Sequence, residues 1–197
     1  GHTLYMGTTG HLSVNAVFYS KLPFNIERDF VPLTQVVSLS SLLYLHPSVP
    51  AKGIKDLIAL AKARPGQLRY ASSGVGGFNH FGGELFKTIA GVDMIHVPYK
   101  GGGPAMIDVM SGQVEVLFST LIQVLPHLRS GKLRPLGVGS EKRTPLLPDV
   151  PTIVESGVAG YDGSIWWGVL GPAGMPTDII SRLNTDIAAV LRDTESA

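Results

Sequence analysis

The segment from Tyr70 to His80 combines the residue types that bind a small anion. It reads Tyr-Ala-Ser-Ser-Gly-Val-Gly-Gly-Phe-Asn-His, the pattern of a strand end that passes through a glycine-rich turn into an amphipathic helix. Such a turn directs backbone N–H groups, hydroxyls and the positive end of a helix dipole at one point, which suits a carboxylate or a phosphate. Because a tight turn also needs glycine for steric reasons alone, a purely structural role is an equally open alternative.

Two other loops have a similar composition. The segment 99–104, Tyr-Lys-Gly-Gly-Gly-Pro, precedes another predicted helix and places Pro104 in its first turn. The segment 7–10, Gly-Thr-Thr-Gly, follows the first predicted strand and offers two hydroxyls. The alternatives are a flexible connection with a solvated lysine in the first case and a turn with solvated threonines in the second.

The candidate residues for catalysis lack a supporting motif. Ser72, Ser73 and Ser119 do not sit in Gly-x-Ser-x-Gly, and the loops show no carboxylate pair and no Ser-x-x-Lys. The histidines lack His-x-x-x-His spacing and cysteine is absent, so no metal site is indicated. The glycine-rich loop also lacks the Gly-x-Gly-x-x-Gly spacing of a dinucleotide site. We therefore expect no catalytic residue, no metal and no cofactor.

The overall composition indicates a globular protein. Of the 197 residues, 44% are hydrophobic, which is enough for one sizeable core or two smaller ones. The net charge is +1 and the basic residues form no run, so charge does not indicate a nucleic-acid partner or an anionic membrane surface. No window approaches the ~20 apolar residues of a membrane span.

Helices alternate with short apolar strands through the middle of the chain. The spacing predicts helices over residues 54–63, 81–89, 104–110 and 121–128, and strands over residues 68–71, 94–97, 114–118 and 133–138. Right-handed crossovers then predict a mostly parallel sheet with helices on both faces. The carboxyl ends of the strands would bring loops 72–77 and 98–103 to one edge together with Ser119 and Thr120, where open α/β sheets bind ligands.

The flanking segments predict a second lobe. They comprise a strand over residues 4–6, a helix or turn over 12–19, a loop at 22–24, crossing strands within 33–45 and at 165–170, a short helix over 152–156 and a last helix over 178–191. One lobe inserted between two crossings is the plan of a hinged protein with a cleft. We place lobe 1 at residues 1–40 and 165–197 and lobe 2 at residues 41–164, with hinges near 38–41 and 163–164.

A series of short motifs spans nearly the whole chain. They are Gly-Thr-Thr-Gly-His at 7–11, Val-Pro-Ala-Lys at 49–52, Tyr-Ala-Ser-Ser-Gly at 70–74, His-Val-Pro-Tyr-Lys-Gly at 96–101, Gly-Gln-Val at 112–114, Leu-Pro-His at 125–127, Gly-Lys-Leu-Arg at 131–134, Leu-Pro-Asp-Val-Pro-Thr at 147–152, and Trp-Gly at 167–168 followed by Pro-Ala-Gly at 172–174. In these motifs and their order, the chain resembles the periplasmic solute-binding receptors of tripartite tricarboxylate transporters, the TctC-like or Bug family. Each motif alone is weak, whereas the set is very specific.

The resemblance implies a type II periplasmic-binding-protein fold, or Venus flytrap, with two α/β lobes, mostly parallel sheets and a hinge. It implies capture of a small organic carboxylate between the lobes, without chemistry, in the periplasm. The acid would be a dicarboxylate, a tricarboxylate, an acidic amino acid or an aromatic acid, delivered to the permease subunits in the membrane. The implied ligand-binding residues are Thr8, Thr9, Ser72, Ser73, Gly74, Val75, Gly76, Gly77, Asn79, His80, Ser119, Thr120 and Trp166.

The chain departs from the family pattern in two respects. Relatives often have an Asp-Asn pair where this chain has Ser119 and Thr120, which leaves the charge preference for the ligand open. Relatives also begin with an export signal and a strand followed by a Pro-Gly-Gly loop, and they continue beyond residue 197. We therefore expect a chain truncated at both ends, with an incomplete lobe 1.

Two other functions stay open on the sequence. An enzyme acting on a small carboxylate on a related hinged fold would need a base in the cleft, and His80 is the obvious candidate. A regulatory effector-binding domain would normally carry a DNA-binding helix pair, which this sequence does not show.

Overall fold

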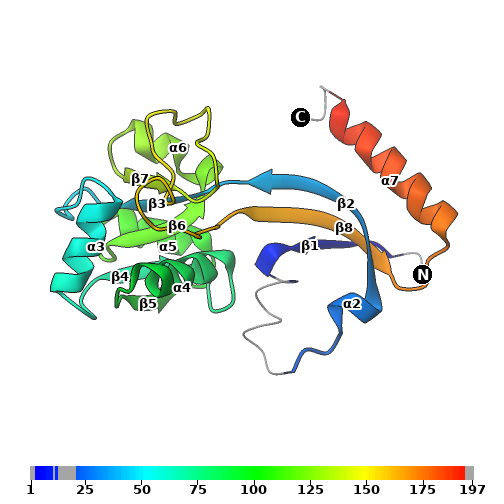
Figure 1. Ribbon diagram of the computed structural model, residues 1–197, viewed down its shortest axis with the longest axis horizontal. Helices are drawn as coiled ribbons and strands as arrows, with labels where there is room; N and C mark the ends of the chain where they lie inside the picture. The colour runs from blue at the N-terminus through cyan, green and yellow to red at the C-terminus, as the bar shows by residue number, and fades with distance from the viewer. Residues whose placement is uncertain (1–2, 11, 13–20, 194–197) are drawn as a thin grey trace. The chain divides into compact units, whose positions relative to one another are not determined.

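The computed structural model describes residues 3–10, 12 and 21–193. The chain divides into two compact units, Gly1–Ser38 with Ile165–Ala197 and Leu39–Ser164, and each is described by itself (Figure 1). The second unit begins slightly before the expected boundary at residue 41. Its first residues are tied to the rest of that unit, because the hydroxyls of Ser40 and Ser140 share a hydrogen bond of 2.8 Å. Within the described part of the chain, no helix is long and apolar enough to cross a membrane.

The described residues of the first unit form a three-stranded sheet and two helices. The strand order is β1-β8-β2. The elements are β1 (Tyr5–Thr8), α2 (Ile26–Asp29), β2 (Phe30–Leu39), β8 (Ile165–Pro172) and α7 (Thr177–Arg192). The helix or turn expected over residues 12–19 lies, apart from Leu12, outside the described residues.

Strand β1 is longer than the sequence predicts. It runs antiparallel to β8 and places Thr8 opposite Trp167, so Gly7 and Thr8 belong to the strand and not to the turn that follows it. Pairing with β8 extends the strand beyond its apolar residues, because every second residue of the ladder exchanges backbone hydrogen bonds with its partner. At the opposite edge of the sheet, the side-chain amide of Asn184 in α7 donates a hydrogen bond of 2.6 Å to the carbonyl of Leu33 in β2.

The second unit contains a five-stranded sheet in the order β5-β4-β6-β3-β7. Its strands are β3 (Ser41–Leu45), β4 (Arg69–Ser72), β5 (Ile95–Pro98), β6 (Val116–Thr120) and β7 (Arg134–Val138). Strand β4 is parallel to β5 and β6, whereas β3 is antiparallel to both β6 and β7. This sheet is therefore mixed: β4, β5, β6 and β7 run in one direction, as the expectation of a mostly parallel sheet requires, and β3 runs against them. In the first unit, β1 and β8 are antiparallel.

The mixed sheet follows from where the chain enters the unit. Strand β3 starts with Ser41 opposite Thr120, the last residue of β6, so it begins at the edge where β4, β5 and β6 end. The rule of right-handed crossovers applies to strands joined through a helix to a parallel neighbour, which holds from β4 onward. Because β3 lies between β6 and β7 and starts at the edge where both of them end, it pairs antiparallel with each.

Helices cover both faces of this sheet (Figure 1). They are α3 (Ile54–Ala63), α4 (Phe78–Ala90), α5 (Gly102–Met110) and α6 (Leu121–Arg129). On one face, buried side chains such as Leu57 of α3 and Phe86 of α4 pack into one core. On the other face, Val109 of α5 and Val124 of α6 belong to a second core. Apolar residues on both faces of the strands explain their continuous hydrophobic runs.

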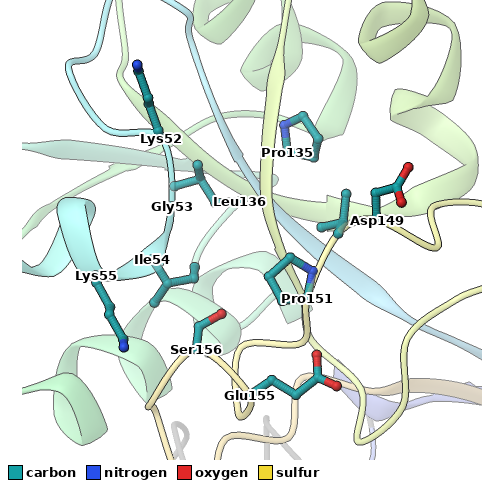
Figure 2. Close-up of a pocket in the computed structure, with 11 residues that line it drawn as sticks. Lys52, Gly53, Ile54, Lys55, Pro135, Leu136, Asp149, Pro151, Glu155 and Ser156 are labelled. Atoms are coloured by element: carbon teal, nitrogen blue, oxygen red, sulfur yellow. The ribbon is translucent and has the colours of Figure 1, made fainter.

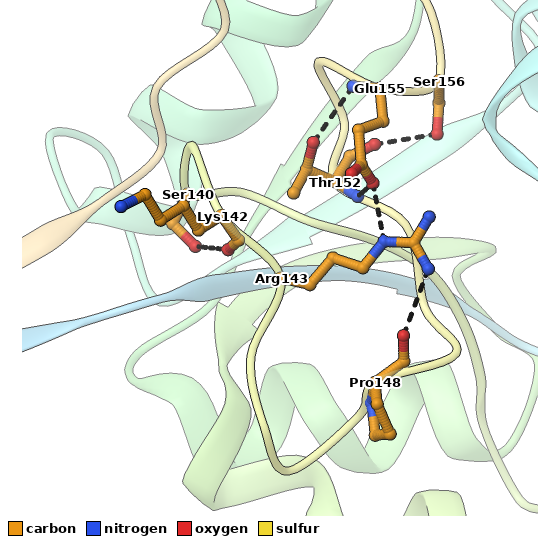
Figure 3. A network of polar contacts seen from close by, with 7 residues as sticks. All are labelled: Ser140, Lys142, Arg143, Pro148, Thr152, Glu155 and Ser156. Carbon is orange, nitrogen blue, oxygen red and sulfur yellow. Dashed lines mark hydrogen bonds and ion pairs between the residues drawn. The ribbon is translucent and has the colours of Figure 1, made fainter.

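The segment after β7 folds back as an ordered loop held by polar contacts (Figure 3). The guanidinium of Arg143 donates to the carboxylate of Glu155 at 2.8 Å and to the carbonyl of Pro148 at 3.1 Å. Thr152 forms a parallel bridge with Val138 and its hydroxyl accepts the N–H of Glu155 at 3.0 Å. The short helix expected over residues 152–156 is therefore wrong: these residues form turns, because Thr152 is held in the extended conformation of the bridge.

Helix α4 lies close to the sheet because it presents glycine there. A Cβ atom added to Gly83 would lie 2.3 Å from the ring of Tyr70. Gly103 in α5, by contrast, has open space at the corresponding position.

We expect Gly83→Ala to lower the free energy of unfolding by about 1–3 kcal/mol, because the added methyl group forces the fully buried Tyr70 ring or the helix to move. The matched control Gly103→Ala should leave stability unchanged or raise it slightly, since alanine favours the helix. Urea denaturation followed by circular dichroism measures both variants. Equal stability of the two would show that α4 has freedom to shift.

Candidate anion-binding site

Three helices start at one edge of the sheet in the second unit. Helices α4, α5 and α6 each begin within a few residues of the ends of β4, β5 and β6. Because β5 and β6 are both parallel to β4, the ends of these strands lie at the same edge. The positive ends of the three helix dipoles therefore meet there.

The starts of these helices have no anionic partner among the described residues. None of α4, α5 and α6 has a side-chain N-cap hydrogen bond or an acidic residue in its first turn. The other described helices all carry acidic residues in the first turn: Glu27 and Asp29 in α2, Asp56 in α3 and Asp178 in α7. The edge thus keeps a positive potential that an anion from solution can satisfy.

The glycine-rich loop between β4 and α4 supplies the best-formed donors. Gly74 and Gly76 have positive φ angles of 135° and 78°, a conformation that other residues rarely adopt. The loop closes on itself through a hydrogen bond of 3.3 Å from the N–H of Gly77 to the carbonyl of Gly74. Within the described part of the chain, the backbone N–H groups of Phe78 and Asn79 donate to no protein group. These two N–H groups can donate hydrogen bonds to an anion at the start of α4.

Three predicted side chains of this loop hold it in place. The Ser73 hydroxyl donates to Asn79 Oδ1 at 2.7 Å, and Asn79 Nδ2 donates to the carbonyl of Phe118 in β6. The Ser72 hydroxyl is fully buried and accepts the N–H of Gly74 at 3.1 Å. These side chains therefore point into the unit and shape the loop, while Val75 is 60% exposed at its tip.

Two histidines lie beneath the loop. His80 Nδ1 accepts the N–H of Gly76 at 3.2 Å, and His96 Nε2 shares a hydrogen bond of 2.6 Å with Ser72 Oγ. Burial lowers the pKa of His80 and lowers that of His96 to about 4, so both rings are neutral at pH 7. Sequence reasoning missed His96, although it stands in the His-Val-Pro-Tyr-Lys-Gly motif, because only strand pairing places it beside Ser72.

The end of β6 and the start of α6 contribute another donor. Thr120 is the N-cap residue of α6, and the hydroxyl of Ser119 donates to Gln123 Oε1 at 2.9 Å. With its oxygen engaged, the exposed Gln123 amide presents its NH₂ group as a donor. Gln123 was also missed, although Thr-x-x-Gln at a helix start is a capping-box pattern that marks this position. Lys100, exposed in the loop before α5, adds a positive charge near the same edge.

The predicted residues of the first unit lie around the contact between β1 and β8. The Thr9 hydroxyl accepts the N–H of Trp166 at 2.8 Å, and Thr8 is opposite Trp167. The Trp166 side chain is half-buried, and Trp167 is 42% exposed. As ligand contacts, Thr8, Thr9 and Trp166 stay predictions.

A cavity at the start of α3 differs from the edge where α4, α5 and α6 begin, because acidic side chains line it (Figure 2). Its volume is about 430 Å³, and both lysines and acidic residues line it, among them Lys52, Lys55, Asp149 and Glu155. Asp56 already accepts the N–H of Lys52 at 2.8 Å. An anion would meet acidic side chains here, so this cavity is a poorer anion site than the edge where α4, α5 and α6 begin. Among the described residues, no group of metal-binding side chains gathers.

Comparisons with known proteins give a family model and several relatives. The family model described as tripartite tricarboxylate transporter family receptor matches residues 1–195. Similar curated proteins include the UPF0065 protein in the tcbD-tcbE intergenic region of Pseudomonas sp. strain P51, 36% identical over 95% of this chain and 56% of that protein. Protein BugT of Bordetella pertussis is 34% identical over 98% of this chain and 59% of its own length.

Solved structures of the same kind superpose closely on the described fold. An R. palustris protein solved with adipate has a TM-score of 0.88 and 38% identity, covering 100% of this chain and 66% of that one. MatC from Rhodopseudomonas palustris with bound malate has a TM-score of 0.87 and 28% identity, covering 99% and 66%. The α/β fold is therefore that of the two-lobe periplasmic solute-binding proteins.

The chain spans little more than half the length of the curated relatives it matches, 56% of one and 59% of the other. The match to the family model nevertheless covers almost every residue. With the fold and the motif order in agreement, the chain belongs to the receptor family of the tripartite tricarboxylate transporters, which includes the Bug proteins.

Proposed function

We propose that the protein is a periplasmic receptor that binds a small organic carboxylate and delivers it to the permease of a tripartite tricarboxylate transporter. The observation that carries the proposal is the edge where α4, α5 and α6 begin without acidic residues or side-chain caps. An anion there accepts hydrogen bonds from backbone N–H groups that are already oriented, so binding costs little conformational entropy. Membership of the family supports the transporter as partner and the periplasm as location.

The ligand class follows from the donors and from the relatives. Neutral N–H and amide groups with Lys100 nearby favour a carboxylate over a cation or an uncharged solute. Solved relatives carry adipate or malate, which supports a dicarboxylate as the first choice among the acids. In this proposal the glycine-rich loop, Ser119, Thr120 and Gln123 contact the ligand, and Thr8, Thr9 and Trp166 stay predicted contacts.

The geometry favours binding without chemistry. The enzyme alternative needs a general base, and His80 is the candidate that the sequence offered. Its Nδ1 lone pair already accepts the N–H of Gly76, and its lowered pKa makes it a weaker base than an ordinary histidine. Its position therefore fits support of the loop better than proton abstraction.

Carboxylates should stabilise the purified protein against heat. At a concentration one hundred times its dissociation constant, a ligand adds about 2.7 kcal/mol, which raises the Tm of a chain this size by roughly 5–10 °C. A thermal-shift series with adipate, malate, glutamate and benzoate measures this effect, with the uncharged diamide of adipate as control. Stabilisation by the diamide equal to that by adipate, or none by any acid, would contradict carboxylate binding.

Gln123→Glu should weaken carboxylate binding at least tenfold while it raises stability. The new carboxylate lies in the first turn of α6, where interaction with the helix dipole is worth about 0.3–1 kcal/mol, but it repels an anionic ligand at the same place. Isothermal titration with the best acid, together with urea denaturation, measures the two effects.

The matched control is Gln113→Glu, which makes the same charge change in the exposed segment before β6, at the far edge of the sheet. Its affinity should stay within about twofold of the wild type. Equal losses in the two variants would mean that net charge, and not the start of α6, governs binding.

A further inference from the structure

Two stacked histidine rings support the glycine-rich loop from below. The ring centroids of His80 and His96 lie 4.1 Å apart at an interplanar angle of 24°, and His96 also stacks with Tyr70, 5.0 Å away. His80 contacts the loop through the N–H of Gly76, and His96 contacts it through Ser72. The pair therefore holds the loop at both of its ends.

We propose that His80 and His96 are positioning residues that shape the anion-binding loop only as a neutral stacked pair, so that protonation of the pair loosens the loop and weakens carboxylate binding. The proposal rests on the function proposed above for this loop. It adds a regulatory property, a dependence of affinity on pH that comes from the protein and not from the ligand.

The hydrogen bond to Gly76 requires an unprotonated Nδ1 on His80. A protonated imidazole donates from both nitrogens and accepts from neither, so a proton on His80 Nδ1 would break the bond to the Gly76 N–H and leave two donors facing each other. Gly76 lies in the conformation that makes the turn. Loss of its hydrogen bond would therefore release the part of the loop that leads into α4.

Because the two rings are stacked, protonation of one makes protonation of the other less favourable. Two positive rings at 4.1 Å repel each other, and burial already disfavours the charged form of each ring. Ser72 is fully buried and also bonds the N–H of Gly74. A positive charge on His96 would therefore lie against the buried Ser72, which leaves no room for water to solvate the charge on that side.

Among the described residues, the charged and titratable groups that act on the pair come from β4 and α4. Tyr70 of β4 donates its hydroxyl to Glu84 of α4 at 2.5 Å, and Lys87 of α4 pairs with the same carboxylate at 2.8 Å. Burial raises the pKa of Glu84, but the hydrogen bonds from Lys87 and Tyr70 outweigh it and keep the pKa below its usual value. While it is ionised, Glu84 attracts a proton to the histidines, and Lys87 opposes this.

The direction of the pH effect follows from these shifts. Both histidines have lowered pKa values in the folded protein, and that of His96 is about 4 against about 6.5 in an unfolded chain. The unfolded chain therefore binds more protons between these values, and stability falls as the pH falls from about 6.5 towards 4. In the same window the neutral pair is progressively lost and the loop loosens.

The test compares variants that remove or keep the hydrogen bond to Gly76. His80→Leu removes the acceptor and should lower the affinity for adipate or malate about tenfold at pH 7.5. His80→Asn offers an oxygen near the position of Nδ1 that does not titrate. It should recover part of this loss and weaken the pH dependence: the ratio of wild-type to His80→Asn affinity falls at least threefold from pH 7.5 to 4.5. Because the ratio compares both proteins at the same pH, titration of the acid cancels.

The matched control is His127→Gln on α6, a partly buried histidine away from the loop, which should keep the wild-type affinity and pH profile. A constant ratio for His80→Asn across the pH range would overturn the proposal. Amide hydrogen exchange at Gly74 and Gly76 without ligand gives an independent result. Exchange should accelerate at low pH, relative to the intrinsic rate, more in the wild type than in His80→Asn, and equal acceleration would also overturn the proposal.

These measurements distinguish failure of the proposed function from failure of the proposed histidine role. If no carboxylate binds the wild type at any pH, the proposed function fails, while hydrogen exchange still decides whether the histidines hold the loop. If the wild type binds carboxylate but the variants share its pH profile, the proposed function stands and the histidine pair does not regulate it.

Discussion

The backbone donors at the start of a helix need acceptors, and this requirement organises the second unit. Every α-helix begins with N–H groups that its own turns cannot satisfy. Here parallel strands bring the starts of α4, α5 and α6 to one edge, and the protein places its first-turn acids on other helices. The need for an anion is therefore concentrated at one place, and the surrounding structure serves to keep those donors oriented.

Side chains of the site act mainly on the backbone. Ser73 and Asn79 bridge the glycine-rich loop to β6, and Ser72 with His96 fixes its entry. Backbone donors held in this way lose little freedom when a ligand arrives, whereas a lysine or arginine would have to order a long side chain. The glycines let the chain turn, and the buried polar side chains fix the turn in one shape.

The sequence predicts the helices of the second unit to within a few residues because their apolar spacing is regular, as in α3 (Ile54–Ala63). It could not predict the direction of β3, since a short apolar strand looks the same whether its neighbours run parallel or antiparallel. The loop 72–77 and Ser119 were identifiable from glycine and hydroxyl content at strand ends. His96 and Gln123 were not, because their roles arise from contacts with Ser72 and Ser119 that only the packed sheet and helices create.

A receptor of the proposed kind has to release what it binds, and dipoles suit this need better than full charges. A carboxylate paired with a buried arginine gains strong charge-assisted bonds, and breaking them leaves a buried charge without a partner. Helix dipoles act within about one turn of the helix end and contribute about 0.3–2 kcal/mol each, so their combined effect depends on the donors converging. A small displacement of the loop at Gly76 lowers that convergence. An affinity that depends on loop geometry can thus be reduced by modest motion, and neutral histidines beneath the loop preserve the geometry without adding a charge that would retain the ligand.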